Sequence, residues 1–178
     1  MTHLNDIRDT LIHARTCYEA WWFFETEHPN REQIVSVYNR YNGFFATVHP
    51  ALFATFLVKL ASVFGTRTDE ISLERIPGIH QIAEFPALWA RGRLFHKYRS
   101  KVIAHRDINV THETFVPESG CLTYDDLKKL LDDTCQLFGT AAQNLKAEGL
   151  PAVTSVDHLL ALILALDQHH NSQHRITE

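Results

Sequence analysis

The chain has 178 residues, 45% of them hydrophobic, so it can bury one core and we expect a single domain over residues 1–178. It opens with mixed acidic and basic residues rather than an apolar leader. The longest apolar run, residues 159–166, is too short to cross a bilayer, and Lys59 interrupts the other candidate, residues 52–64. Three widely spaced cysteines fit neither a disulfide framework nor a zinc site. These features predict a soluble cytoplasmic protein without a membrane segment.

Charge is unevenly distributed along the chain. The formal net charge is −4, which argues against indiscriminate nucleic-acid binding because such binding needs Lys and Arg to displace condensed counterions. Residues 85–106 nevertheless contain six basic residues and no Asp or Glu, which leaves about −10 for the rest of the chain. The six are Arg91, Arg93, Lys97, Arg99, Lys101 and Arg106. Such a segment is either a solvated basic face or a binding site for an anion.

Apolar residues recur at helical spacing along nearly the whole chain, which predicts an all-α protein, an up-and-down bundle of about six or seven helices. The first helix is expected at residues 4–25. The second is expected at residues 31–48 and stops at Pro50, since proline lacks the N–H that a helix interior needs. The third is expected at residues 51–64.

The second half of the chain carries clear helix boundaries. Ser72 is expected to start a short helix that Pro77-Gly78 kinks or splits. The next helix begins near Pro86, which suits a first turn, and runs to about His105. Residues 107–122 are then a loop or small hairpin.

Two capping-box patterns predict the last two helices. Thr123 with Asp126 opens a helix that continues to about Glu148, and Thr154 with Asp157 opens the final one. The final helix is apolar on nearly all sides over residues 159–166, so it is either central or part of a dimer contact. From about residue 169 to residue 178 the tail is expected to be frayed.

Helical periodicity places Arg99 on the packed side of the helix that begins near Pro86. Leu88, Phe95, Val102 and Ile103 fall on one arc, flanked by Leu94 and Tyr98, and Arg99 lies within it. A buried guanidinium needs an anion or a dense set of acceptors. The partner is either a carboxylate on a neighbouring helix or a phosphate in a crevice between subunits.

His105 does not share that face. It lies about 120° around the helix from Arg99, so the two side chains converge only at a helix end or with help from a second subunit. Tyr98 and Lys101 do share its face, and nearby cations favour the neutral imidazole that can accept a proton. Asp107 either orients His105 or caps the helix. A lone histidine at a helix end is also compatible with a purely structural role.

The run KYRSKVIAHRD, residues 97–107, resembles the Arg-x(4–6)-His signature of the HEPN superfamily, in the form R-x-K-x-x-A-H-x-D of its abortive-infection, AbiU-like branch. Phe64-Gly65, a polar loop with Asp69 and the run SLERI at 72–76 resemble the segment that precedes the motif in that branch. Leu122-Thr123 and the amphipathic helix after it resemble the segment on the C-terminal side of that motif. The resemblance covers about residues 51–145.

The resemblance implies a dimeric helical bundle that cleaves RNA without a metal or cofactor, as a toxin or phage-defence effector, with a cognate antitoxin as a further partner. Arg99 would bind the scissile phosphate and His105 would move protons. The residues expected to guide the RNA backbone are Arg93, Lys97, Ser100, Lys101 and Arg106, with Tyr98 and Asp107 in support.

Ser100 departs from the family pattern, in which the residue after the arginine is often an amide, and a hydroxyl has a shorter reach and fewer donors. Ser100 and the negative net charge of the whole chain favour an alternative, a non-catalytic HEPN-like dimeric module that binds a protein or a nucleotide. A metal site is not expected: His170 and His174 have i, i+4 spacing, but no HExxH motif or Cys pair accompanies them. Clustered aromatics such as Trp21 and Phe24 indicate core rather than a ligand pocket.

Overall fold

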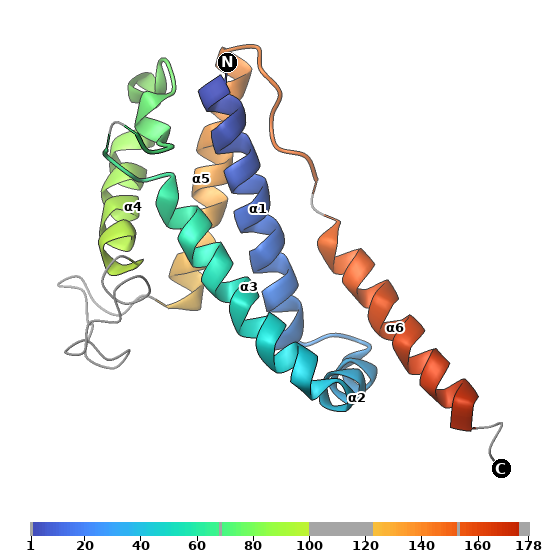
Figure 1. Cartoon of the computed structure of the whole chain (residues 1–178). Helices are drawn as coiled ribbons and strands as arrows, with labels where there is room; N and C mark the ends of the chain where they lie inside the picture. Colours follow the sequence, from blue (N-terminus) through green and yellow to red (C-terminus); the bar gives the residue numbers. More distant parts are fainter. Residues whose placement is uncertain (1, 68, 100–122, 153, 175–178) are drawn as a thin grey trace, which may run out of the picture. The chain divides into compact units, whose positions relative to one another are not determined.

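The computed structural model describes residues 2–67, 69–99, 123–152 and 154–174, and within them the chain is an all-α helical bundle without strands, as the sequence predicts (Figure 1). The α-helices and two short 3-10 turns are α1 (Thr2–Glu25), α2 (Arg31–Arg40), α3 (Asn42–Ser62), η1 (Leu73–Arg75), η2 (Ile79–Gln81), α4 (Phe85–Arg99), α5 (Tyr124–Asn144) and α6 (Ser155–His174).

Residue contacts divide the chain into two compact units. The first comprises Met1–Arg15 and Phe56–Pro151, and the second comprises Thr16–Thr55 and Ala152–Glu178. Helices α1 and α3 contribute residues to both units. The predicted single domain over residues 1–178 therefore stays a prediction, and each unit is described by itself.

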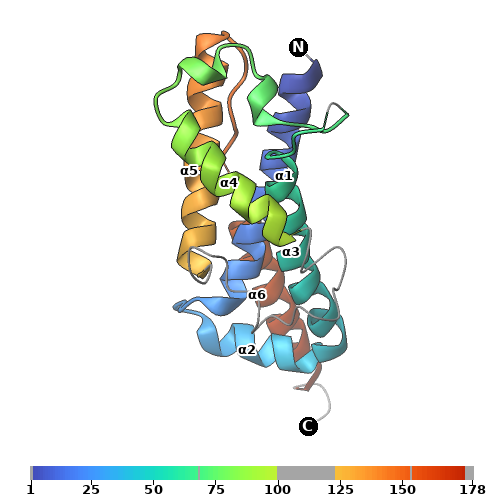
Figure 2. The ribbon, with the colours of Figure 1, turned by 90° about the vertical axis from the view of Figure 1, so that its left-hand side faces the viewer.

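The first unit is organised around α4 and α5, which pack against each other, while η2 packs on α4 (Figure 2). Pro77-Gly78 splits the segment after Ser72 into η1 and η2, as predicted, and Gly78 takes the left-handed conformation with φ 77°. The fully buried side chains include Phe56, Leu60, Phe64, Leu88, Phe95, Leu131 and Phe138. These residues come from α3, the segment directly after it, α4 and α5, so their burial holds the three helices together.

The capping box at the start of α5 is confirmed. The Thr123 hydroxyl accepts a hydrogen bond from the Asp126 N–H at 3.1 Å, and the Asp126 carboxylate accepts one from the Thr123 N–H at 3.0 Å. These backbone and side-chain hydrogen bonds from Thr123 hold the pKa of the Asp126 carboxyl below its usual value of 3.8. The box thus satisfies two N–H groups that the helix itself leaves unpaired.

Thr123→Ala is expected to lower the free energy of unfolding by about 1 kcal/mol at neutral pH, because the Asp126 N–H loses its acceptor. Since the pKa of Asp126 is lower in the folded protein, its contribution is present above pH 3.8 and is lost as pH falls through the folded value. Urea unfolding of both proteins at neutral and at acidic pH measures this difference. If the difference in free energy of unfolding between wild type and Thr123→Ala were the same at every pH, the role of the Asp126 carboxylate would be contradicted.

The end of α5 differs from the expected position near Glu148. The helix stops at Asn144, and Lys146 adopts φ 52°, the left-handed region. The Ala147 N–H donates to the Ala142 carbonyl at 2.8 Å and the Lys146 N–H donates to Gln143 at 3.0 Å, a pairing typical of a Schellman turn. A lysine terminates the helix by local hydrogen bonding before Gly149 is reached.

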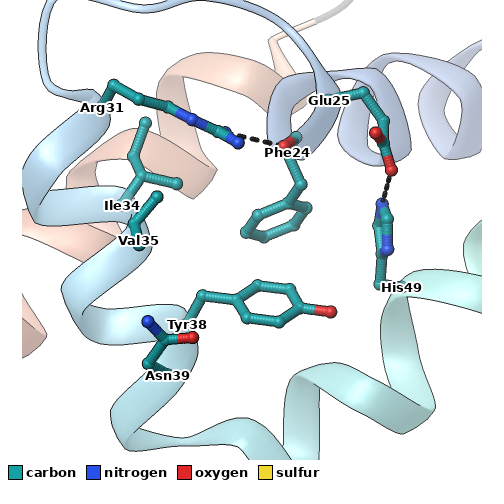
Figure 3. Close-up of a pocket in the computed structure, with 8 residues that line it drawn as sticks. All are labelled: Phe24, Glu25, Arg31, Ile34, Val35, Tyr38, Asn39 and His49. Atoms are coloured by element: carbon teal, nitrogen blue, oxygen red, sulfur yellow. Dashed lines mark hydrogen bonds and ion pairs between the residues drawn. The ribbon is translucent and has the colours of Figure 1, made fainter.

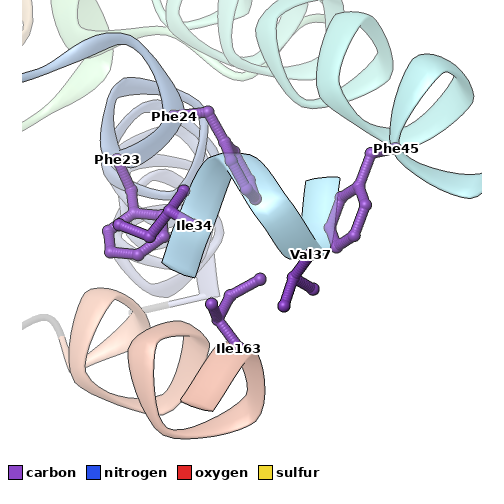
Figure 4. Packing of buried hydrophobic residues seen from close by; sticks show 6 residues of the cluster. All are labelled: Phe23, Phe24, Ile34, Val37, Phe45 and Ile163. Carbon is purple, nitrogen blue, oxygen red and sulfur yellow. The ribbon is translucent and has the colours of Figure 1, made fainter. Parts of the chain in front are cut away.

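The core of the second unit lies between α2 and α6 and includes residues from α1 and α3. Phe23, Phe24, Ile34, Val37, Phe45 and Ile163 form one buried cluster (Figure 4). Leu159, Leu160 and Leu166 are partly buried against it, whereas Leu162 is 51% exposed. The apolar run at 159–166 therefore packs on this cluster by one face, while Leu162 on its other face is exposed. The dimer contact predicted for this run stays a prediction.

Two predicted boundaries are wrong. The second helix ends at Arg40 rather than near residue 48, and Pro50 lies inside α3 instead of ending a helix. A proline inside a helix costs up to about 3 kcal/mol, but Phe45 before it and Phe56 after it are both buried, and their burial favours a continuous helix. At the C-terminus, α6 continues to His174, where the sequence predicts a frayed tail from residue 169.

Within the described residues, one helix, α3, is long and apolar enough by length and composition to cross a bilayer, even though it contains Lys59. A core helix passes the same test, so this single candidate is weak evidence and is compatible with a soluble protein. The cytoplasmic location stays a prediction.

Candidate functional site

Helix α4 carries the first part of the predicted motif and ends at Arg99, directly before residues 100–122. The remaining predicted site residues lie outside the part of the chain that the structure describes, as does the expected helix end at His105: Ser100, Lys101, His105, Arg106 and Asp107. The pairing of Arg99 with His105 and the support from Tyr98 stay predictions. The described part of α4 shows how the Arg99 end is positioned.

The predicted packed face of α4 is confirmed over its described length. Leu88 and Phe95 are buried, with 2% and 0% of their surfaces exposed. Leu94, expected at the flank of this face, is instead 49% exposed. Residue 99 follows Phe95 by four positions, and residues four apart lie on one side of a helix. By this spacing Arg99 is in line with Phe95 along the helix, and the packing of its side chain stays a prediction.

Gly92 is the point of closest approach between α4 and the end of α3. A Cβ atom built there would lie only 2.0 to 2.4 Å from ring atoms of Phe64, which is itself fully buried. Only glycine leaves room for the phenyl ring at this distance. The contact sets how closely, and in which register, α4 packs on this segment.

Two side chains of α4 bind carbonyls at the C-terminal end of α3. Arg93 donates from a terminal guanidinium nitrogen to the Phe64 carbonyl at 3.0 Å, and His96 Nδ1 lies 2.9 Å from the Ala61 carbonyl. Ala61 lies in the last turn of α3, where carbonyls carry partial negative charge, and Phe64 lies two residues beyond the helix, so these donors complement the end of α3 and the segment after it. Together with the Gly92 contact, these hydrogen bonds attach the second half of α4 to the segment 61–64.

The positive charge of α4 is partly neutralised by α5. Arg91 lies 2.5 Å from the Asp133 carboxylate, a pairing of residues 42 positions apart that the sequence does not reveal. Arg93 is half-buried against the Phe64 carbonyl, whereas Lys97 is exposed. The predicted RNA contacts of Arg93 and Lys97 stay predictions. Among Arg91, Arg93 and Lys97 of α4, Lys97 is exposed and has neither of the two contacts that hold the arginines.

Two further observations concern possible metal ligands and the Cys135 thiol. No three His, Cys, Asp or Glu side chains within the described ranges lie close enough together to bind a metal ion. Burial raises the pKa of the Cys135 thiol to about 11, so it is protonated at neutral pH and a poor nucleophile.

Comparison with known families decides the relationship. A family model, HEPN_AbiU2 (AbiU2), matches residues 2–161. The chain belongs to the AbiU2 family of HEPN domains. No curated protein and no solved structure shows a significant match. The AbiU2 match includes the whole of residues 51–145, where the sequence resembles the abortive-infection branch, and extends to α1, α2 and part of α6. The protein is therefore a HEPN-like abortive-infection protein.

Sequence reasoning missed three residues that position α4. Gly92 carried a signal, because a glycine inside a helix weakens it unless close packing requires the space. His96 stands nine residues before His105 but outside the motif, and Asp133 belongs to a distant helix. Only tertiary structure shows that His96 bonds to the Ala61 carbonyl and that Asp133 pairs with Arg91.

Proposed function

We propose that this AbiU2 protein is a metal-independent endoribonuclease whose active site combines Arg99 and His105. The observation that carries the proposal is the acid-free basic segment, whose described part, up to Arg99, is a helix attached to the core. A guanidinium offers five N–H donors in a planar fork, a geometry that matches phosphate oxygens. Family membership supports the same assignment.

The proposed chemistry needs only proton transfer and charge stabilisation. A ribose 2′-oxygen attacks the adjacent phosphorus and loses its proton, while the 5′-oxygen of the next nucleotide leaves and gains one. His105 would serve one of these proton transfers, since imidazole titrates near neutral pH. Arg99 would stabilise the charge that develops on the phosphate oxygens. Lys97, Lys101 and Arg106 would contact neighbouring phosphates, with Ser100 as an additional donor.

The proposal includes a homodimer. His105 lies about 120° from Arg99 around a straight helix, so a second copy can supply the missing half of the site. Because the exposed face of α6 around Leu162 remains apolar, it is one surface that a second copy could cover. The RNA substrate, the cytoplasmic location, the defence or toxin role and a neutralising antitoxin belong to this proposal.

The test is incubation of purified full-length protein with mixed cellular RNA in excess EDTA. The proposal expects fragments to accumulate, and it expects Arg99→Ala and His105→Ala proteins to leave the RNA intact. If wild-type protein leaves the RNA uncut, or if both variants cut as well as wild type does, the ribonuclease assignment is wrong. RNA binding without cleavage would instead favour the non-catalytic module.

Lys97→Ala is expected to weaken RNA binding without abolishing cleavage. An exposed lysine that contacts one phosphate contributes through counterion release, so its loss should reduce the salt slope of log K by about 0.7 for single-stranded RNA. Filter binding across a salt series measures the slope. The matched control is Lys59→Ala, a lysine on α3 outside the basic segment, and an equal effect of both variants would contradict a specific role for Lys97.

A further inference from the structure

A pocket in the second unit lies between the end of α1, the length of α2 and His49 of α3 (Figure 3). Its volume is about 400 Å³, within the range of pockets that bind small molecules. The lining residues are Phe24, Glu25, Arg31, Ile34, Val35, Tyr38, Asn39 and His49. None of them belongs to the proposed ribonuclease site, so a role for this pocket does not depend on that site.

The apolar part of the pocket is aromatic. The rings of Phe24 and Tyr38 lie 5.6 Å apart in an edge-to-face arrangement, and Tyr38 stacks on Phe45 behind it at 5.3 Å. Phe24 and Ile34 belong to the buried cluster of this unit, so this wall is rigid. Figure 3 shows the Tyr38 hydroxyl pointing toward His49. A flat ring entering the pocket would meet aromatic faces and edges on one side.

The two charged side chains of the lining, Glu25 and Arg31, have different neighbours. His49 Nε2 lies 3.2 Å from a Glu25 carboxylate oxygen, so the acidic group of the lining already has a partner. Arg31 donates to the neutral Phe24 carbonyl at 2.7 Å and faces no carboxylate at ion-pair distance among the described residues. One N–H of its guanidinium is used, and the others remain for a ligand. Arg31 is therefore the place in the lining where an anion meets a guanidinium without an opposing carboxylate at ion-pair distance.

His49 forms a polar edge of the pocket. Its Nε2 atom is buried, yet despite the short distance to Glu25 it has no hydrogen bond of good geometry to any described residue. The ring is fixed by stacking on Trp21 at 6.2 Å and 13°. His49 and Glu25 therefore face each other at one side of the pocket, and Arg31 is the polar group that remains for a ligand.

From this arrangement we infer that the pocket binds a small aromatic anion, with its ring against Tyr38 and Ile34 and its acidic group at Arg31. The anion can be a carboxylate or a phosphate, since both match the guanidinium fork. Asn39 at the rim and the Tyr38 hydroxyl supply further polar contacts. A ligand without charge would leave the Arg31 interaction unused and should bind more weakly.

The test is titration of ¹⁵N-labelled full-length protein with benzoate, phenyl phosphate and neutral benzamide, following amide shifts of residues 31–39 and His49. Saturable binding of at least one anion is expected, with benzamide at least about tenfold weaker, the loss expected when a charge-assisted bond is missing. The better anion identifies the preferred acidic group. No saturable shift with either anion, or equally tight benzamide binding, would overturn the inference.

A matched pair of variants at Val35 tests the charge preference without disturbing the core. Arg31 binds the end of α1, so replacing it risks unfolding, whereas Val35 lines the pocket and is 40% exposed. Val35→Glu should weaken anion binding at least about tenfold more than Val35→Gln, because the two side chains are similar in size and differ in charge. Equal affinities in the two variants would show that charge does not select the ligand.

Discussion

Arg99→Ala is expected to lower the rate of RNA cleavage by about 10²–10³-fold, the loss typical of removing one preorganised donor to a developing anion. His105→Ala should lower it by about 10²–10⁴-fold, the range for a general acid or base. The measurement is single-turnover cleavage of a defined RNA in EDTA. Arg99→Lys, which keeps the charge but not the planar fork, should fall between wild type and Arg99→Ala.

Controls for RNA binding and for folding distinguish a loss of catalysis from a loss of structure in these variants. Each variant should retain the helical circular dichroism of wild type, and its affinity for RNA should change far less than its cleavage rate. A drop in affinity as large as the drop in rate would place Arg99 in uniform substrate binding rather than in transition-state stabilisation.

Gly92→Ala is expected to destabilise the protein by about 1–3 kcal/mol, since the added methyl group overlaps the Phe64 ring and one of the two helices must shift. The matched control is Gly139→Ala in α5, where a Cβ atom would meet nothing within 4 Å. That substitution should stabilise by about 0.5–1 kcal/mol through helix propensity.

Thermal or urea unfolding measures both changes. Although both substitutions replace glycine with alanine, Gly92→Ala should lower the stability of the protein and Gly139→Ala should raise it. For a chain of this length, each 1 kcal/mol shifts Tm by about 2–4 °C. A Gly92→Ala protein as stable as wild type would show that α4 does not need its close approach to Phe64. The Gly92 contact would then have no part in positioning the Arg99 end of α4.

Local sequence signals predicted those parts of the fold that depend on near neighbours. The box of Thr123 with Asp126 and the split at Pro77-Gly78 need only a few adjacent residues, and both are confirmed. The buried positions Leu88 and Phe95 follow from helical periodicity alone. These features required no knowledge of which helices pack together.

Tertiary packing explains the failures. Pro50 satisfies every local criterion for a helix end, but burial of apolar residues on both sides of it keeps α3 continuous. The true break falls at Tyr41, where φ is −106° and ψ is 35°, directly before Asn42-Gly43, a pair typical of turns. A local rule gives the destabilisation that proline causes in a helix. It does not include the free energy gained when apolar residues on both sides of the proline are buried.

The sequence predicts which residues make up the candidate site, but it does not predict the contacts that hold α4 in place. The basic segment and Arg99 come from residue types and from the family resemblance, while the carbonyl partners of Arg93 and His96 lie 29 and 35 residues away in sequence. The pocket around Arg31 was missed because clustered aromatic residues indicate core. Phe24 is indeed core, and the same ring also forms a wall of the pocket.

The central claim is that Arg99 of one copy and His105 of another form a single RNA-cleaving site, and mixing two inactive variants tests it most directly. Arg99→Ala and His105→Ala proteins would be purified separately, mixed, allowed to exchange subunits and assayed with RNA in EDTA. Each mixed dimer contains one intact composite site, so activity should return to about a quarter of wild type after statistical exchange. A mixture no more active than its components would contradict the composite site.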